Sequence, residues 1–504
     1  MVVLVGVVVL SVTTACRPES RGARCRGGGW AQGPTHVLRC TKGRWSPVMS
    51  KQSLLRALAD ASARRRVPTT TAATTTTAAI RPVTSPPALF PAEDPLPPPP
   101  PTSLISLGVG GVPSGGSTAP SIASDGNAVA FTTTSALVTT DRNGAADVYV
   151  HDLDTGTTVL VSATADGDAG TGASTGGSLS TNGRLVAFSS TADDLALGDG
   201  NGVADVFVRD LATSTTTRIS TTELGEDAPS SSGGALIADD GSAVTFWSTA
   251  SLLPQDTNDT TDAYLHDVVS GTTELVSIGE DGVTIGDGPS FPAAISADAQ
   301  LVAIGTRATN LVSGDTNGAA DVVVRDRETD QTLRVSLADT GAEPNDDSGV
   351  APSTSGANGS PVVSADLSDD GRFVVFSSVA TNLSGDDTNG ASDVYVRDLD
   401  RGVTTRMSAT AGGGPPRWAD SPTISGDGST VAYRSSQRDP SGWSPGTSAV
   451  VAVPTTGEST ELVSILPDGA NATTAASPSL NYDGTKVALT MRNPGNEVYI
   501  RTLD

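Results

Sequence analysis

Cysteine and histidine are scarce in this chain of 504 residues, and each shortage excludes a class of site. All three cysteines lie within the first 40 residues, so the rest of the chain can form neither a disulfide framework nor a thiolate metal site. The histidines are only His36, His151 and His266. Because most hydrolytic mechanisms use a histidine, so few of them argue against hydrolytic catalysis.

Charged residues are also sparse, at 17%, and their two signs are unevenly distributed. Up to Pro100 the chain holds 13 of its 31 Lys and Arg and 4 of its 56 Asp and Glu, which leaves 18 basic and 52 acidic residues in the remainder. Such a body repels phosphate backbones, so we expect no nucleic-acid partner. The 55 glycines and 32 prolines favour strands and turns over helices.

The first hundred residues differ from the rest. The apolar run Val2–Ala15 has the length of a signal-peptide core but no preceding basic residue, so residues 1–48 are either an export signal or an extension upstream of a start near Met49. Residues 49–102 form a low-complexity Thr/Ala/Pro linker, in which Ser50–Arg66 could form a short helix. We expect an extracytoplasmic protein, secreted, periplasmic or on the cell surface, with membrane or envelope association through the N-terminus.

From Ser103 onward the sequence repeats. Leu367–Ser408 reads LSDDGRFVVFSSVATNLSGDDTNGASDVYVRDLDRGVTTRMS, and similar units surround it. The turn before the second strand of each unit falls at Asp125, Asn182, Asp240, Asp298, Asp370, Asp427 and Asp483, at intervals of 57, 58, 58, 72, 57 and 56 residues. An insertion near Gly341–Gly359 explains the long interval.

Each unit predicts four short strands. In the unit around Asp370 these are Val362–Leu367, Arg372–Ser378, Ser392–Leu399 and Val403–Ala409, with period-two alternation and Gly-containing hairpin turns. Four-stranded units repeated radially are β-propeller blades. The last unit ends after its third strand, and Ser103–Leu107 supplies a fourth. The prediction is therefore an all-β, seven-bladed propeller over residues 103–504, closed by this N-terminal strand.

The repeats SDDGRFVVFSS and GDTNG followed by DVYVRDL resemble the TolB-like, WD40-like (PD40-type) propeller repeats over about four fifths of the chain. The resemblance implies the propeller fold and says little about function. The α/β domain that precedes the propeller in TolB is replaced here by low-complexity sequence. We therefore do not extend the role of TolB in envelope integrity to this chain.

The repeated loop GDTNGAADVVVRD, Gly314–Asp326, lies between the second and third strands of its unit. These loops and the connectors between units share one face of a propeller, and the tight turns share the other. We expect the face with the long loops, called the long-loop face, to bind a protein or glycan partner. We also expect a monomer.

The loops present oxygen ligands that suit Ca²⁺, although no cofactor is required for the fold. The alternative is structural: Asp315 and Asn317 make Asx turns, the Asn-Gly step takes positive φ, and Asp321 hydrogen-bonds the next loop. The candidate ligands are Asp141, Asn143 and Asp147; Asp199, Asn201 and Asp205; Asp256, Asn258 and Asp262; Asp315, Asn317 and Asp321; and Asp387, Asn389 and Asp393.

We interpret the chain as a non-catalytic binding scaffold that uses its acidic long-loop face. One alternative is a calcium-dependent surface or adhesive protein, and another is a carbohydrate-active enzyme that uses carboxylates near the central channel. His151 and His266 occupy the repeat position of Arg209, Arg325 and Arg397, so they are repeat variants rather than a metal or catalytic pair. Trp247, Trp418 and Trp443 could stack on sugars if exposed, although packing is the commoner use of tryptophan.

Overall fold

The computed structural model describes residues 30–32, 36–41, 44–50 and 102–503, except for 109, 356–360, 386, 409–417, 437–447, 458–459, 473 and 493–494. The chain divides into two compact units, Met1–Pro95 and Leu96–Asp504. In the described residues every regular element is a strand. No helix long and apolar enough to cross a membrane occurs among them.

In the first unit three strands pair in the order β1-β2-β3 (Trp30–Gln32, His36–Thr41 and Arg44–Ser50), all antiparallel. No strand is expected here from the sequence, and the short helix expected over Ser50–Arg66 lies, beyond Ser50, outside the described residues. The apolar run Val2–Ala15 and the Thr/Pro-rich part of the linker lie outside the described residues.

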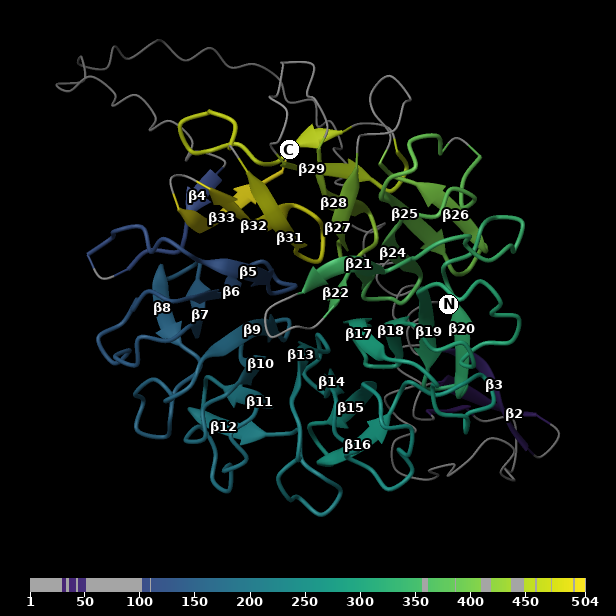
Figure 1. Ribbon diagram of the computed structural model, residues 1–504, viewed down its shortest axis with the longest axis horizontal. Helices are drawn as coiled ribbons and strands as arrows, with labels where there is room; N and C mark the ends of the chain where they lie inside the picture. Colours follow the sequence, from purple (N-terminus) through teal and green to yellow (C-terminus); the bar gives the residue numbers. More distant parts are fainter. Residues whose placement is uncertain are drawn as a thin grey trace, which may run out of the picture. The chain divides into compact units, whose positions relative to one another are not determined.

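In the second unit the described residues form seven four-stranded antiparallel sheets, each a blade; six have their strands in sequence order, and the seventh ends with the N-terminal strand β4. Blades 1 to 4 are β5 to β8 (Thr118–Ile122, Ala128–Thr133, Asp147–Asp152, Thr157–Leu160), β9 to β12 (Ser174–Leu179, Leu185–Ser190, Asp205–Asp210, Thr215–Arg218), β13 to β16 (Ser232–Ile237, Ala243–Ser248, Asp262–Asp267, Thr272–Leu275) and β17 to β20 (Ser290–Ile295, Leu301–Thr306, Asp321–Asp326, Gln331–Arg334). Blades 5 and 6 are β23 to β26 (Ala365–Leu367, Phe373–Ser378, Asp393–Asp398, Val403–Arg406) and β27 to β30 (Ala419–Ile424, Thr430–Ser435, Ala449–Pro454, Glu461–Leu462). Blade 7 is β31 to β33 (Ala475–Leu480, Lys486–Arg492, Asn496–Thr502) with β4 (Thr102–Leu104). Figure 1 shows the first strand of each blade facing the centre of the ring.

The hydrophobic core lies between neighbouring blades. The described residues form seven buried clusters, and each combines side chains from two adjacent sheets. Phe131 and Tyr149 of blade 1, for example, pack with Ala488 and Val498 of blade 7. Because the second and third strands of each blade have neighbours on both faces, they are almost continuously apolar and buried.

The predicted closure of the ring is confirmed. Strand β4 pairs antiparallel with β33, with Leu104 opposite Tyr499 and Thr102 opposite Arg501. The ladder starts one residue earlier than the predicted Ser103 and its named strand ends at Leu104, while the backbone N–H of Ile105 still donates to the carbonyl of Val498 at 3.0 Å. The N-terminal strand therefore covers the edge that blade 7 would otherwise expose.

The predicted insertion forms a hairpin in blade 5. Strands β21 (Val350–Ser355) and β22 (Pro361–Val363) pair with each other, and the N–H of Ser364 donates to the carbonyl of Gly349 at 2.7 Å. The first strand of this blade is therefore shorter than the predicted Val362–Leu367, because its first half is diverted into the hairpin. Figure 1 places β21 and β22 beside the centre of the ring.

Candidate functional site

The asparagine of each repeated loop has a structural role. Asn317 accepts a hydrogen bond from the N–H of Ala319 at 2.8 Å, which is an Asx turn, and its amide donates to the carbonyl of Pro344 at 2.9 Å. Gly318 follows with φ +63°. Equivalent Asx contacts form at Asn143, Asn201, Asn258 and Asn389. The asparagine side chains therefore shape the loops through bonds to the backbone.

The second aspartate of each loop ties the third strand to the end of the fourth. In blade 4 the hydroxyl of Ser336 donates to Asp321 Oδ1 at 2.5 Å and accepts from the N–H of Val322 at 3.1 Å. The same serine bond is found at Asp147, Asp205, Asp262 and Asp393, and Glu497 replaces the aspartate in blade 7. One oxygen of each carboxylate thus accepts from the serine, and in blades 2 and 5 the other accepts from the loop asparagine, Asn201 at 2.8 Å and Asn389 at 2.9 Å.

An arginine lies beside the paired carboxylates of blades 2 and 4. Arg218, at the end of β12, lies 3.0 Å from Asp199 Oδ1 and 3.7 Å from Asp205 Oδ2. In blade 4 Arg334 takes the same place beside Asp315 and Asp321, at 3.5 and 3.7 Å. Each arginine also pairs with an acid of the following connector, Asp227 and Glu343 respectively.

Tyrosine replaces arginine in blades 1 and 3. The Tyr149 hydroxyl donates to Asp141, and the Tyr264 hydroxyl donates to Asp256. The residue opposite each tyrosine on the fourth strand is a leucine, Leu160 or Leu275, where blades 2 and 4 have arginine.

Burial, the largest cause, raises the pKa of Asp147 and of Asp262 to about 6, and it also raises that of Asp199 and of Asp321 to about 6 despite the arginine beside them. Blade 5 has both the tyrosine and the arginine. Tyr395 faces Arg406 on the neighbouring strand, and its hydroxyl donates to Asp387 at 3.1 Å.

The five predicted sets of ligands stay separate, since each set belongs to its own blade. Nowhere in the described part of the chain do three or more His, Cys, Asp or Glu side chains converge into a group that could hold a metal ion. His151 and His266 each bond a threonine of the neighbouring strand, at 2.9 and 3.0 Å. The equivalent Arg209 bonds Thr216 in the same way at 2.8 Å, so the histidines are repeat variants, as predicted.

The tight-turn end of the central channel is closed by backbone bonds between blades. The N–H of Thr181 donates to the carbonyl of Asp239 at 2.8 Å, and that of Tyr482 donates to Ser124 at 2.9 Å, which joins blade 7 to blade 1. Further bonds of this kind start from Asp125, Asp240, Ala297, Asp369 and Asp427. This ring fixes the seven turns around the channel mouth.

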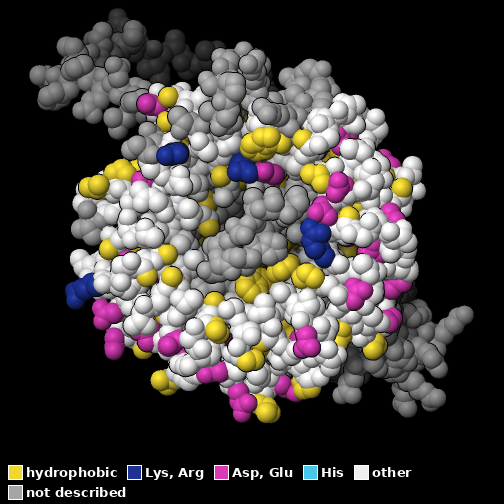
Figure 2. Space-filling model, viewed as in Figure 1, with side chains coloured by type: hydrophobic (Ala, Val, Ile, Leu, Met, Phe, Trp, Pro, Cys, Tyr) yellow, Lys and Arg dark blue, Asp and Glu magenta, His cyan; other side chains and the backbone are white. Residues whose placement is uncertain are grey.

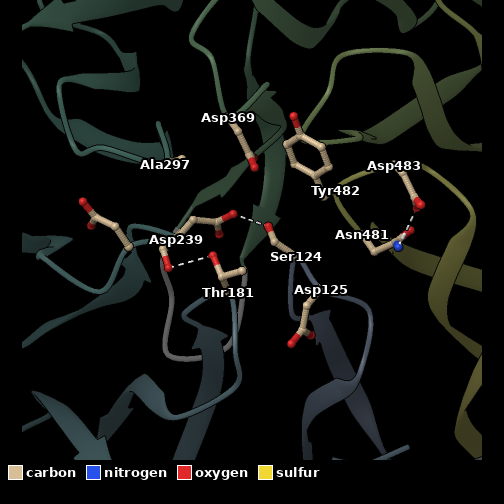
Figure 3. A pocket seen from close by; sticks show the side chains of 10 residues that line it. Ser124, Asp125, Thr181, Asp239, Ala297, Asp369, Asn481, Tyr482 and Asp483 are labelled. Carbon is tan, nitrogen blue, oxygen red and sulfur yellow. Dashed lines mark hydrogen bonds between the residues drawn. The ribbon is translucent and has the colours of Figure 1, made fainter. Parts of the chain in front are cut away.

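A polar cavity of about 490 Å³ lies inside that ring (Figure 3). Asp239 of blade 3 and Asp369 of blade 5 meet there, and the turn of the blade between them contributes only the small side chain of Ala297. Ser124 donates to Asp239. Burial, followed by the charge of Asp239 and the hydrogen bond to it, raises the pKa of Asp369 to about 8. The Asp369 carboxyl group is therefore protonated near neutral pH and hydrogen-bonded to Asp239.

Carboxylates near the central channel are expected from the sequence, but this particular pair is not. The sequence signal for this pair is a doubled aspartate before the turn glycine, Asp239-Asp240 and Asp369-Asp370. At the position of Asp239 and Asp369 the other units have Ser, Thr, Ala, Gly or Tyr. Asp239 and Asp369 come together only when the ring of blades closes, and the sequence of a single repeat unit does not reveal that contact.

A second cavity, of about 470 Å³, lies along the first strands of the blades. Trp247 and Phe291 line it and contact each other edge to face, with ring centroids 6.3 Å apart. Gly233 and Gly234 make room for the indole, since a Cβ on either would lie 2.7 or 2.6 Å from it. Of the other predicted tryptophans, Trp418 stacks under Arg434 and Trp443 lies outside the described residues.

The long-loop face carries exposed acids in its loops and connectors, among them Asp166, Asp194, Glu223, Glu280 and Asp287. The exposed arginines on the described part of this face are Arg142, Arg307 and Arg492, and Arg307 is paired with Asp347. Figure 2 shows acidic side chains spread along the rim of one face of the molecule, with few basic ones.

The described residues define a seven-bladed β-propeller, the fold that the resemblance to TolB-like propellers predicts, with two cavities along its channel. No protein-family model matches the chain, and no curated protein matches it. Similar solved structures include an oligogalacturonate lyase in complex with manganese, at 15% identity and TM-score 0.46, covering 77% of this chain and 88% of that one. They also include a putative TolB from Agrobacterium tumefaciens, at 14% identity and TM-score 0.37, covering 70% and 96%. The β-propeller domain of the Trilobed protease from Pyrococcus furiosus is 10% identical with TM-score 0.44, covering 77% and 95%.

Proposed function

We propose that the chain is an exported, non-catalytic binding scaffold whose partner docks on the acidic long-loop face and inserts a side chain into the cavity beside Trp247. The observation that carries the proposal is the cavity itself, in which an indole held between two glycines and Phe291 presents a fixed aromatic wall. Pockets of this volume with aromatic walls and a polar rim are typical of ligand sites.

The surrounding charge favours a basic partner. Exposed carboxylates on the long-loop face attract cations over roughly a Debye length, about 8 Å at physiological salt. A guanidinium or ammonium over an indole face gains a further ~0.5–2 kcal/mol from cation–π attraction. A protein segment carrying arginine or lysine therefore fits both the rim and the wall, whereas a neutral glycan would use the wall alone.

Calorimetric titration of the full chain tests this proposal with three probes: an arginine-rich peptide, an acidic peptide of equal length and a neutral oligosaccharide. We expect binding of the basic peptide, weakened at high salt and reduced about tenfold by Trp247→Leu through the lost cation–π contact. Tyr482→Leu, at the opposite end of the channel, is the matched control and should bind normally. Binding that is equal in all three proteins would refute the role of the cavity.

The pair Asp239 and Asp369 supports a second candidate, a carbohydrate-active enzyme. A carboxyl group with its pKa raised to about 8 stays protonated at neutral pH, which is the state a general acid requires. Incubation with polyuronates and neutral glycans, followed by assay of new reducing ends or unsaturated products, tests it. Product formation that Asp369→Asn abolishes would favour the enzyme over the scaffold.

A further inference from the structure

The repeated loops differ in how they compensate two buried carboxylates. In blades 1 to 5 one pair of facing residues makes the difference. It joins the third-strand residue two positions after the second aspartate to the last residue of the fourth strand. These facing pairs are Phe207 with Arg218, Val323 with Arg334, Tyr149 with Leu160, Tyr264 with Leu275, and Tyr395 with Arg406. Arginine thus reaches the carboxylates of blades 2, 4 and 5, but not those of blades 1 and 3.

Blades 2 and 4 show which atoms await a cation. There the guanidinium lies between Oδ1 of the first aspartate and Oδ2 of the second, as Arg218 does between Asp199 and Asp205. The arginine is itself buried, with its side chain 6% exposed. The position between the carboxylates is therefore a cation position in an interior that excludes most water.

In blade 3 the same two atoms have neither a hydrogen bond nor an arginine beside them among the described residues, whereas in blade 4 these atoms of Asp315 and Asp321, also without a hydrogen bond, lie 3.5 and 3.7 Å from Arg334. Asp256 Oδ1 and Asp262 Oδ2 are buried without a hydrogen bond to any described residue, and the two residues are 6% and 0% exposed. Their other oxygens are fixed, by Tyr264 on Asp256 and by Ser277 on Asp262. The carboxylates are thus held in place and aimed at the position that a guanidinium fills in blades 2 and 4.

Blade 1 repeats the arrangement. Asp147 is fully buried, its Oδ1 accepts from Ser162, and its Oδ2 has no hydrogen-bond partner among the described residues. Tyr149 holds Asp141, which is 6% exposed. Arg218 acts on Asp205 and Arg334 on Asp321, but the described residues supply no basic side chain that acts on Asp147 or Asp262. A buried uncompensated carboxylate is strongly unfavourable, so a counter-charge is expected.

We propose that blades 1 and 3 each bind one Ca²⁺ ion between their paired loop aspartates, at the position that arginine fills in blades 2 and 4. The ligands would be Asp141 and Asp147 in blade 1, and Asp256 and Asp262 in blade 3. Carboxylates are hard oxygen ligands, and main-chain carbonyls with water complete the shell of Ca²⁺. Two carboxylates per site balance its charge. Mg²⁺ fits less well because it demands near-ideal octahedral geometry, whereas Ca²⁺ accepts flexible coordination.

This proposal narrows the sequence hypothesis from five loops to two, and it is independent of the proposed partner on the long-loop face. Calorimetric titration of the full chain, freed of metal by chelator, should give two Ca²⁺ ions per chain. Thermal unfolding should show a higher Tm with Ca²⁺ than with chelator. At a free concentration 100 times Kd, each site favours the folded state about 100-fold.

Exchanging the blade types provides the decisive variants. The double variant Leu160→Arg with Leu275→Arg supplies the guanidinium that blades 2 and 4 have, and it should abolish both the binding and the Tm shift. Leu160→Met with Leu275→Met is the matched control and should keep them. The reverse exchange, Phe207→Tyr with Arg218→Leu, gives blade 2 the pattern of blades 1 and 3 and should raise the stoichiometry from two to three.

Several results would overturn the proposal: no Ca²⁺ binding to the wild-type chain, a Tm shift that persists in the double arginine variant, or a response to Mg²⁺ in place of Ca²⁺. A stability that depends on pH between 5 and 7 without any effect of metal would show that protons compensate the carboxylates instead. Because the wild-type stoichiometry is measured without any substitution, the proposal stays testable even if an arginine variant does not fold.

Discussion

Removal of the N-terminal closing strand should destabilise the whole propeller. A chain that starts at Gly108 lacks β4 together with Ile105 and Ser106, whereas a chain that starts at Pro101 keeps them. Ile105 is 3% exposed and packs between blades 7 and 1. The Ser106 hydroxyl donates to Glu497 at 2.6 Å, and it accepts from the N–H of Val498 at 3.0 Å.

The magnitude follows from these contacts. Burial of an isoleucine side chain contributes about 2–3 kcal/mol, and a hydrogen bond to a charged group about 1.5–3 kcal/mol. The truncation therefore removes about 5 kcal/mol before the lost β4–β33 ladder is counted. That is comparable with the total stability of many domains, about 5–15 kcal/mol. It also removes one of the partners of the buried Glu497, which keeps the hydroxyl of Ser114 and the N–H of Gly115.

Thermal unfolding followed by circular dichroism, together with size-exclusion chromatography, measures the effect. We expect the chain starting at Gly108 to melt roughly 5–10 °C lower than the chain starting at Pro101, and to aggregate through its exposed β33 edge. The chain starting at Pro101 should melt like the full chain. Equal melting temperatures for the two truncations would show that the N-terminal strand does not close the ring.

Three further predictions concern the loops, the channel and the N-terminus. Gly318→Ala should lower the free energy of unfolding, measured by urea titration, by about 1 kcal/mol with or without Ca²⁺, because the φ angle of this residue is +63°. An added Cβ would have no atom within 4 Å at Gly318 or at Gly385, but Gly385 lacks a positive φ, so Gly385→Ala should have little effect. Equal losses in the two variants would contradict the argument from backbone strain. The pKa of Asp369 is raised from its ordinary 3.8 to about 8, so its protonation stabilises the fold fully below about pH 4, and this contribution is lost as pH rises through 8. The free energy of unfolding in urea should therefore fall between pH 5 and 8, and Asp369→Asn should flatten that fall. An unchanged slope would mean that Asp369 titrates normally. Residues 1–100 fused to a reporter that is active only outside the cytoplasm should yield activity, and retention in the cytoplasm would remove the claim of export.

The sequence predicted the fold well because its signals are local and repeated. Six of the seven blades are built from one continuous stretch of sequence, with local signals such as the period-two alternation of DVYVRD and the Asp-Gly turns. Copies of the same pattern fix the blade count, and the unit without a fourth strand identifies β4 as its complement. The Asx turns at Asn317 and its equivalents are local too, since the side chain bonds an N–H two residues away.

The sites were less predictable because they depend on which residues meet across strands and blades. The loop motif DxNGxxD is nearly constant in the sequence, yet its environment changes with a residue 13 positions after the second aspartate, Arg218 in blade 2 and Leu160 in blade 1. Pairing register brings that residue beside the loop. The motif alone therefore could not distinguish loops with a built-in cation from loops without one.

The sequence by itself determined the all-β repeat, the number of blades and the seam, because these follow from hydrogen-bonding patterns and turns that each unit carries. Only the tertiary structure decided where the functional candidates lie. Asp239 and Asp369 are 130 residues apart and meet because closure of the ring brings the turns of blades 3 and 5 to one channel mouth. Trp247 lines a cavity because two glycines of the adjacent inner strand make room for its ring. Such contacts are set by the packing of blades around a common axis, which no single repeat encodes.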